Sequence, residues 1–204
     1  PNEVPLYLMS KRLSEEITVV LSGEGADEIF GGYGRIFRSS EDLDLYNDWK
    51  ARDFEIKSEM DQNLMNKYGK KIDGELEFFL HLYSYTSQND LRTLFDDRII
   101  DNFNNGPTIE KFRQCFSHLE NQDLQTKMMY TFEILHLPGL LFRLDSTTMG
   151  ASVEGRVPFV DHELVEYAFK LPNAIKMKWI SNPPTGILGD RSSEIHDVTK
   201  WVLK

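Results

Sequence analysis

The spacing of apolar residues along the chain predicts several amphipathic helices and one short buried strand. Residues 5–15, 75–85 and 122–135 repeat apolar side chains every three or four positions, which is the period of a helix with one buried face. Residues 17–21 form a continuous apolar run rich in β-branched side chains, as is typical of a strand in a parallel sheet. The pattern therefore predicts part of an α/β fold, predominantly helical with few strands.

Capping and breaking residues refine the ends of these segments. Pro138 and Gly139 are expected to break the helix over 122–135, because proline lacks the backbone N–H that a helix interior uses. Asp161 is expected to cap a helix over residues 162–170, since its side chain can accept hydrogen bonds from the first free amides of that helix.

Composition narrows the class of protein. The 204 residues carry a formal net charge of −10, which argues against a nucleic-acid partner, and no apolar run is long enough to span a membrane. The single cysteine, Cys115, excludes an internal disulfide and fits a reducing compartment, so a soluble, cytoplasmic protein is expected. The start at Pro1, with neither a methionine nor a signal-peptide pattern, leads us to expect the middle of a longer chain.

A cluster of candidate functional residues follows the predicted strand. Residues 22–25 form a glycine-containing turn, and a short helix is expected over 26–30. Backbone amides at such a turn attract anions, yet Glu24, Asp27 and Glu28 would repel a phosphate. A magnesium ion resolves this conflict, because Mg²⁺ is commonly held by one or two carboxylates together with nucleotide phosphates. The sequence therefore predicts a Mg²⁺–nucleotide or Mg²⁺–pyrophosphate site at the end of a parallel strand.

Two long motifs in this chain carry a family resemblance. Residues 22–28, followed by 30–33, resemble a nucleotide-site motif of the glutamine-dependent asparagine synthetase (class B) family. Residues 144–161 look like the other signature of that family, and the similarity continues to Pro172. Residues 200–204 are similar to a family segment that usually reads Lys-x-x-Leu-Arg.

The resemblance implies a fold and a reaction. The fold would be an adenine-nucleotide alpha-hydrolase-like domain, also called a PP-loop ATP pyrophosphatase domain. The reaction would be an ATP- and Mg²⁺-dependent ligation in which a carboxylate such as that of aspartate is adenylated and ammonia then displaces AMP. The ammonia would come from a glutaminase domain of the same longer chain. The resemblance leaves open whether the protein forms a homodimer.

The family also implies segments that this sequence lacks. Its members carry an N-terminal glutaminase domain, and their synthetase domain opens with a Ser-Gly-Gly-x-Asp-Ser phosphate loop. Neither occurs here, so residues 1–204 are expected to be the C-terminal portion of the synthetase domain, inactive by themselves.

The resemblance assigns roles around the turn. Asp27 is the candidate Mg²⁺ ligand, against the simpler interpretation of an acid that complements a helix dipole. Glu24 would orient the substrate or manage a proton of the incoming ammonia, unless it is only a solvated loop residue. Ser22 and the amides of Gly23 and Gly25 would bind pyrophosphate.

A lysine near the C-terminus is the candidate cation. Lys200 would stabilise charge on the α-phosphate in the transition state, although an ordinary surface lysine on a terminal helix beginning at Asp197 is an equal alternative. Lys204 stands where the family usually has arginine. Glu154 and Arg156 share one face of a strand and are expected to form a buried pair that braces the site.

One departure from the family bears on the substrate. Many members carry an acidic residue directly after Leu-Pro, whereas this chain has Gly139 after Leu137 and Pro138. This difference points away from free aspartate. Two alternatives therefore stay open: an adenylating enzyme for another carboxylate, such as a β-lactam-forming synthetase, a peptide cyclase or an amidase of sugar carboxylates, and an inactive scaffold module.

Overall fold

The computed structural model describes residues 2–50, 61–62, 65, 74–84, 91, 93–102, 106–178 and 198–203. The chain forms two compact units, which are treated separately. The first comprises residues 1–33, 129–178 and 198–204, and the second comprises residues 34–128 and 179–197. No helix in the described part of the chain is long and apolar enough to cross a membrane.

The first unit contains both of the strands found in the described residues. Its elements are α1 (Glu3–Leu13), β1 (Val19–Leu21), α2 (Ala26–Phe30), the last residues of α9 (Leu124–Thr131), the π-helical turn η1 (Phe132–His136), α10 (Leu137–Met149), β2 (Glu154–Arg156), the short helical turn η2 (Pro158–Val160), α11 (His162–Lys170), α12 (Asn173–Lys176) and η4 (Trp201–Leu203). This content is mostly helical with a small parallel sheet, consistent with the α/β class expected from the sequence.

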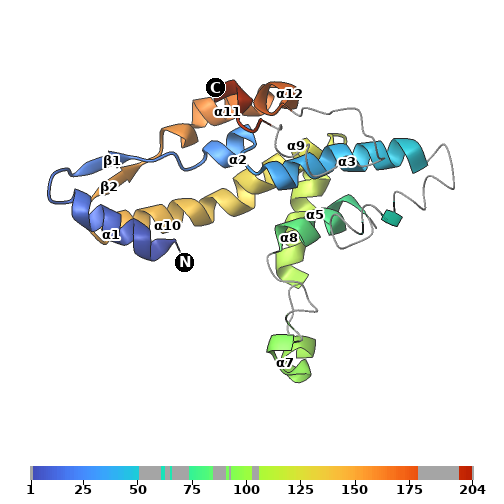
Figure 1. Cartoon of the computed structure of the whole chain (residues 1–204), viewed down its shortest axis with the longest axis horizontal. Helices are drawn as coiled ribbons and strands as arrows, with labels where there is room; N and C mark the ends of the chain where they lie inside the picture. Colours follow the sequence, from blue (N-terminus) through green and yellow to red (C-terminus); the bar gives the residue numbers. More distant parts are fainter. Residues whose placement is uncertain are drawn as a thin grey trace. The chain divides into compact units, whose positions relative to one another are not determined.

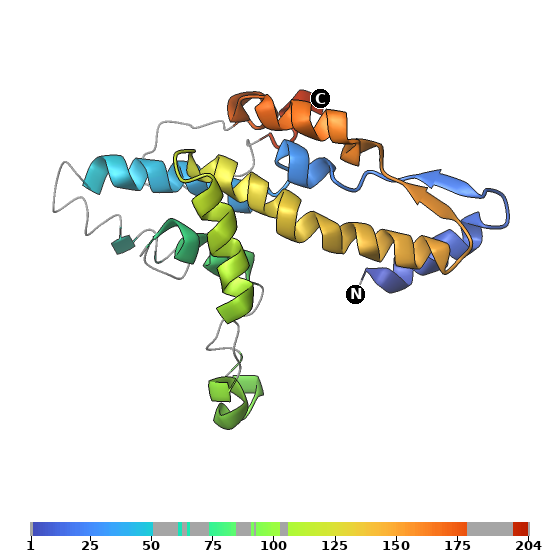
Figure 2. The same ribbon diagram turned by 180° about the vertical axis from the view of Figure 1, so that it is seen from behind.

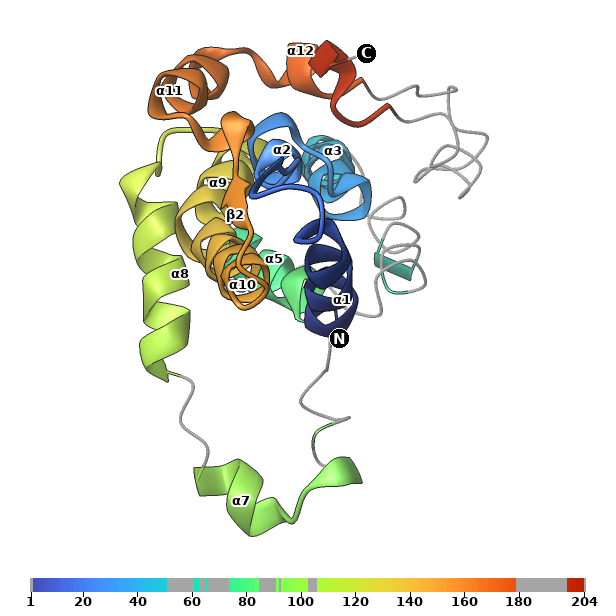
Figure 3. The same ribbon diagram turned by 90° about the vertical axis from the view of Figure 1, so that its left-hand side faces the viewer.

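The two strands pair in parallel. Val19 lies opposite Glu154 and Leu21 lies opposite Arg156, and the amide of Ser22 continues the ladder by donating to the Arg156 carbonyl at 2.8 Å. α10 packs against both β2 and α1, and Figures 1 and 2 show it running alongside the sheet. In Figure 3, α10 is seen nearly end-on, with β2 and α1 on different sides of it. A strand is confirmed within residues 17–21, shortened to three residues, but the prediction that it is buried is wrong, since Val19 is 37% exposed and Leu21 is 69% exposed.

The helix predicted over 122–135 does not end at Pro138 and Gly139. Instead α9 continues through η1 into α10, and Pro138 occupies the first turn of α10. Proline is tolerated there because its missing N–H has little use in a first helical turn. The π-helical turn, whose hydrogen bonds span five residues instead of four, joins α9 to α10 without a break. The helix break predicted at Pro138 and Gly139 is therefore wrong.

The cap predicted at Asp161 is confirmed. Its carboxylate accepts hydrogen bonds from the amides of Glu163 at 3.1 Å and Leu164 at 3.2 Å, and α11 then runs to Lys170. α11 packs against α2 through a cluster of buried and partly buried apolar side chains, Ile29, Phe30, Phe159, Leu164, Val165 and Ala168. This contact anchors the short helix that follows the glycine turn.

The helix expected from Asp197 is not formed over residues 198–200. Val198 makes an isolated antiparallel bridge with Lys178, and Lys200 has a φ of +50°, which a helix cannot accommodate. A short η4 follows, and the Lys178 ammonium lies 4.8 Å from the centre of the Trp201 ring. Asp197 and Lys204 lie outside the described residues.

The second unit is helical wherever the structure describes regular elements in it. It contains α3 (Gly34–Lys50), α5 (Glu75–Tyr83), α7 (Asp97–Asn102), α8 (Gly106–His118) and the start of α9. The Phe79 ring contacts the rings of Tyr83, Phe112 and Phe116, so α5 and α8 share an aromatic core. Lys127 and Glu75 add an ion pair at 2.7 Å. The helix predicted over 75–85 is thus confirmed, with Tyr83 as its last residue.

An unusual carboxyl group lies in the π-helical turn of the first unit. The Oε1 atom of Glu133 is buried and has no hydrogen-bond partner among the described residues. Burial raises the pKa of Glu133 to about 7, and the positive charge of Lys176 opposes this rise. Below about pH 7 the folded chain therefore keeps this side chain protonated and neutral.

This burial predicts a pH dependence of stability. From pH 4.5, the ordinary pKa of the group, to about pH 7, the unfolded chain is ionised at Glu133 while the folded chain keeps the proton. The free energy of unfolding should therefore fall as pH rises through this window, by roughly 2–3 kcal/mol, and then level off. Urea titrations at a series of pH values measure it. Glu133→Gln should remove this part of the slope, whereas Glu110→Gln on an exposed part of α8 should retain it.

Candidate functional site

The turn after β1 is shaped by its backbone. The hydroxyl of Ser22 accepts a hydrogen bond from the amide of Glu24 at 3.3 Å. Gly25 has a φ of +92°, and a β-carbon there would lie 2.5 Å from Cγ2 of Val160. Only glycine adopts this conformation without strain and without collision. A β-carbon on Gly23, in contrast, would meet nothing within 4 Å, so the backbone is open to approach at that residue.

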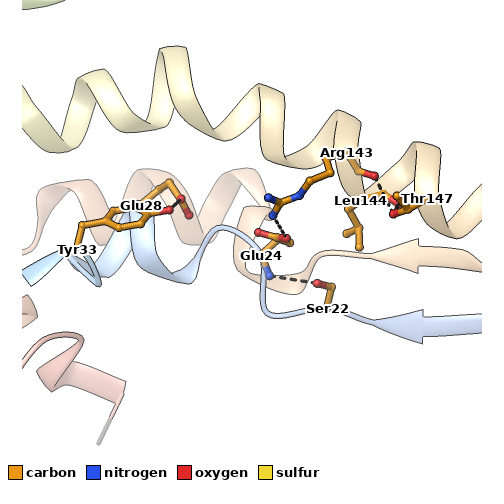
Figure 4. A network of polar contacts seen from close by, with 7 residues as sticks. All are labelled: Ser22, Glu24, Glu28, Tyr33, Arg143, Leu144 and Thr147. Carbon is orange, nitrogen blue, oxygen red and sulfur yellow. Dashed lines mark hydrogen bonds and ion pairs between the residues drawn. The ribbon is translucent and has the colours of Figure 1, made fainter. Parts of the chain in front are cut away.

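Glu24 forms an ion pair with a residue far away in the sequence. Nη2 of Arg143, on α10, donates to Oε1 of Glu24 at 2.8 Å, across 119 residues of chain (Figure 4). The two side chains are only 22% and 20% exposed. The Nε atom of Arg143 is buried and lacks a hydrogen-bond partner within the described residues. The guanidinium is therefore held at one end and retains an unused donor.

This ion pair borders a cavity of about 370 Å³. The cavity is lined by Glu24, Arg143, Asn2, and the α1 residues Pro5, Leu6 and Met9. One side of it is thus apolar, and the other presents a carboxylate and a guanidinium.

Asp27 and Lys200, to which the family resemblance assigns roles around the same nucleotide, are in direct contact. Nζ of Lys200 lies 2.8 Å from Oδ1 of Asp27, and both side chains are partly exposed. A β-carbon on Gly32 would overlap the Asp27 carboxylate, so the glycine makes room for it. The candidate metal ligand and the candidate cation therefore lie side by side, next to the glycine turn.

Glu28 turns away from this pair into the interior. It is 1% exposed and accepts a hydrogen bond from the Tyr33 hydroxyl (Figure 4). Burial, and then the hydrogen bond to Glu28, raise the pKa of Tyr33, so the hydroxyl stays protonated. Tyr33 stacks on Phe132 with ring centres 4.8 Å apart and contacts His136 edge-on at 5.8 Å. Glu28 thus braces the helix that carries Asp27.

The charges of Glu24 and Glu28 affect the pKa of the His136 side chain. Burial lowers the pKa of His136, Arg143 lowers it further, and the charges of Glu28 and Glu24 oppose the change. Because burial is the largest influence, the imidazole is held neutral near pH 7.

The pair expected between Glu154 and Arg156 exists, but it is not buried. Nε of Arg156 donates to Oε1 of Glu154 at 2.8 Å, with side chains 61% and 53% exposed. The expectation of a buried brace is therefore wrong, because the alternate residues of β2 that carry these charges face outward. The contacts of Tyr33 with Glu28 and with Phe132, which the sequence analysis did not predict, brace the helix that carries Asp27 instead.

A cation held by protein side chains alone is not indicated. Among the residues that the structure describes, no group of three or more His, Cys, Asp or Glu side chains is arranged to bind a metal. A magnesium ion at Asp27 would therefore need oxygen ligands from a bound phosphate, which is its usual mode of binding beside nucleotides.

Comparison with known proteins identifies the family. Residues 1–204 match the asparagine synthase family, so the chain belongs to that family. Asparagine synthetase (glutamine-hydrolyzing) 3 of Bacillus subtilis (strain 168) is 32% identical over 184 residues, which cover 90% of this chain and 25% of that protein. Asparagine synthetase (glutamine-hydrolyzing) 1 of the same organism is 30% identical over 189 residues, covering 87% and 28% respectively. The chain thus spans about a quarter of the length of these relatives. No solved structure matches it significantly.

The two glycines of the turn make a matched test of this geometry. Gly25→Ala should lower the free energy of unfolding by about 2–4 kcal/mol, because it forces a left-handed backbone on alanine and overlaps Val160. Gly23→Ala should change it by no more than about 0.5 kcal/mol, since its β-carbon enters open space. Urea denaturation of both variants measures the difference, and equal losses would contradict the described turn.

Proposed function

We propose that the complete protein containing this chain is an ATP-dependent ligase of the asparagine synthetase type. It adenylates the side-chain carboxylate of aspartate and transfers ammonia to it, giving asparagine, AMP and pyrophosphate, with the ammonia taken from glutamine. The observation that carries this proposal is the contact of Lys200 with Asp27 beside the glycine turn, in a chain of the asparagine synthase family. Both relatives described above are named glutamine-hydrolyzing asparagine synthetases.

The side chains fit ATP with Mg²⁺. The ion pair uses Oδ1 of Asp27, and the carboxylate is partly exposed, so it offers the hard oxygen donor that Mg²⁺ prefers. Bound Mg²⁺ would neutralise phosphate charge. Lys200 would then contact a phosphate oxygen in place of Asp27 and stabilise charge in the transition state.

The geometry of the turn supports the remaining proposed roles. The open approach at Gly23 supports pyrophosphate binding by Ser22 and by the amides of Gly23 and Gly25. Glu24, at the edge of the cavity, orients the substrate or handles a proton of the incoming ammonia.

We further propose that residues 1–204 form the C-terminal portion of a PP-loop ATP pyrophosphatase domain, with the glutaminase domain and the first phosphate loop elsewhere in the complete protein. Alternate apolar residues at β1, Ile17, Val19 and Leu21, are exposed, and Leu21 is 69% exposed. Parallel sheets are normally covered on both faces, so this face is suited to further structure from the same protein. The single buried Cys115 accords with a cytoplasmic location.

A second candidate function keeps the chemistry and changes the acid. A β-carbon on Gly139 would meet nothing within 4 Å, so the position has room for the acidic side chain that this sequence lacks. The absence of that acid from the sequence, rather than the room for it, supports a related adenylating enzyme that acts on another carboxylate. A pyrophosphate-release screen of the full-length protein over carboxylic acids, with glutamine or ammonia, distinguishes the two functions.

Substitution of the proposed metal ligand tests the magnesium site. In the full-length protein, Asp27→Asn should lower Mg²⁺-dependent pyrophosphate release by about 100-fold or more, because an amide oxygen is a weaker, uncharged donor. Asp161→Asn, a matched change that keeps its capping oxygen, should leave the rate unchanged. Equal kinetics of Asp27→Asn and the parent protein would remove Asp27 from the metal role.

Substitution of the lysine tests its role in the chemical step. Lys200→Ala should lower kcat by about 10- to 1000-fold while changing the KM for ATP much less, since the proposed contact strengthens in the transition state. The rate of pyrophosphate release as a function of ATP concentration separates the two parameters. A rise in the KM for ATP at constant kcat would instead make Lys200 a ground-state binding residue.

A further inference from the structure

The backbone of Lys200 adopts a conformation that side-chain-bearing residues rarely take. Its φ of +50° lies in the left-handed region, and among the non-glycine residues that the structure describes, only Ser152 shares this feature. Such a conformation costs free energy, so it persists where surrounding contacts hold it, and it is often found at functional sites. The contacts around Lys200 therefore show what directs its ammonium to Asp27.

Backbone hydrogen bonds hold the turn at its start and at its end. Lys178 and Val198 exchange both hydrogen bonds of their antiparallel bridge, with N–O distances of 2.9 and 2.8 Å. This bridge fixes the backbone two residues before Lys200. On the other side, the amide of Leu203 donates to the carbonyl of Lys200 at 3.0 Å. The left-handed residue thus lies between two fixed points of the backbone.

One side-chain contact spans the same turn. The ammonium of Lys178 lies 4.8 Å from the centre of the Trp201 ring, which is a cation–π distance. Trp201 directly follows Lys200 and is 43% exposed. A ring that solvent reaches can adopt several orientations, and the cation over its face favours one of them. The contact therefore restrains residue 201 and, through the peptide bond, residue 200.

The segment that forms the bridge is also packed against the helix that carries Asp27. Met177, directly before the bridge, is 2% exposed, and a β-carbon on Gly31 would overlap its side chain. Gly31 ends α2, and its amide donates to the carbonyl of Asp27. α12 and η4 are in contact and lie next to each other in Figure 3. The contacts thus lead from α2 through Met177 and the bridge to Lys200.

We propose that Lys178 and Trp201 are positioning residues for Lys200. Their cation–π contact and the neighbouring bridge hold the left-handed turn that directs the Lys200 ammonium to the Asp27 carboxylate, beside which the phosphates of ATP would bind. Lys178 acts through Trp201, and neither side chain needs to touch the nucleotide. The inference rests on the proposed function, in which Lys200 stabilises charge on the α-phosphate.

Kinetics of the full-length protein test this role. Lys178→Met removes the cation and keeps the bridge, which uses only backbone atoms. It should lower kcat for pyrophosphate release by about 2- to 5-fold with little change in the KM for ATP, because a cation–π contact at an exposed site is modest. Lys178→Arg, which keeps a cation, should retain most of the activity. Trp201→Leu should also lower kcat, and adding Lys178→Met to it should cause no further loss.

A second background separates positioning from damage to the fold. In Lys200→Ala, Lys178→Met should lower kcat no further, because the lysine that it positions is absent. An equal loss in both backgrounds, or an unchanged kcat in Lys178→Met alone, would overturn the proposal. A rise in the KM for ATP at constant kcat would make Lys178 a nucleotide-binding residue and would overturn it as well. Lys170→Met, the same change at an exposed position of α11, should leave both parameters unchanged.

A chemical measurement keeps this inference distinct from the proposed function. If the full-length protein releases no pyrophosphate, the ligase assignment fails, and limited acetylation with acetic anhydride, followed by mass spectrometry, still tests the positioning role. The Lys200 amine must leave Asp27 before it reacts. Its acetylation should therefore be about 2- to 5-fold faster in Lys178→Met, and also faster in Asp27→Asn. Unchanged acetylation of Lys200 in Lys178→Met would refute the positioning role.

Discussion

The parallel pairing of β1 with β2 is the constraint on which the candidate site depends. The ladder extends one step past β1, through the amide of Ser22 and the carbonyl of Arg156, and so fixes where the chain leaves the sheet. From that point the backbone must turn at once, and Gly25 permits the turn close against Val160. α2 then begins at a set position, held by its apolar contacts with α11. The sheet is small, but it determines the direction in which three acids project.

Glu24, Asp27 and Glu28 each contact a different partner, so each carboxylate lies in a different electrostatic environment. Glu24 is paired with a largely buried guanidinium, Asp27 with a partly exposed ammonium, and Glu28 with a half-buried phenol. Ion pairs that solvent can reach exchange partners at little cost, whereas breaking a buried pair leaves an uncompensated charge. The Asp27 pair is the more exposed of the two ion pairs, so it can exchange its partner at a lower cost than the Glu24 pair, while Glu28 helps to hold its helix in place.

The local features of the fold could be predicted from the sequence because they depend on neighbouring residues. The apolar run before Ser22, the short helix over 26–30 and the cap at Asp161 each follow from a few side chains and their backbone preferences. The contacts that build the site depend on distant residues. One sequence cannot show that Arg143 meets Glu24 across 119 positions, or that Lys200 adopts a left-handed backbone and meets Asp27. The motif indicated the candidate residues, and the fold shows what each one touches.

The π-helical turn at η1 has a consequence for the whole of α10. Phe132, at its start, packs under Tyr33, while Arg143, three turns farther along the same rod, must face Glu24. A π turn contains one residue more than an α turn, and each residue rotates the helix by about 100°. The additional residue therefore rotates α10 relative to α9. This rotation allows Phe132 to contact Tyr33 while Arg143 faces Glu24, both beside the turn between β1 and α2. A homologue with an uninterrupted α-helix here would have to reach that turn with a different register of side chains.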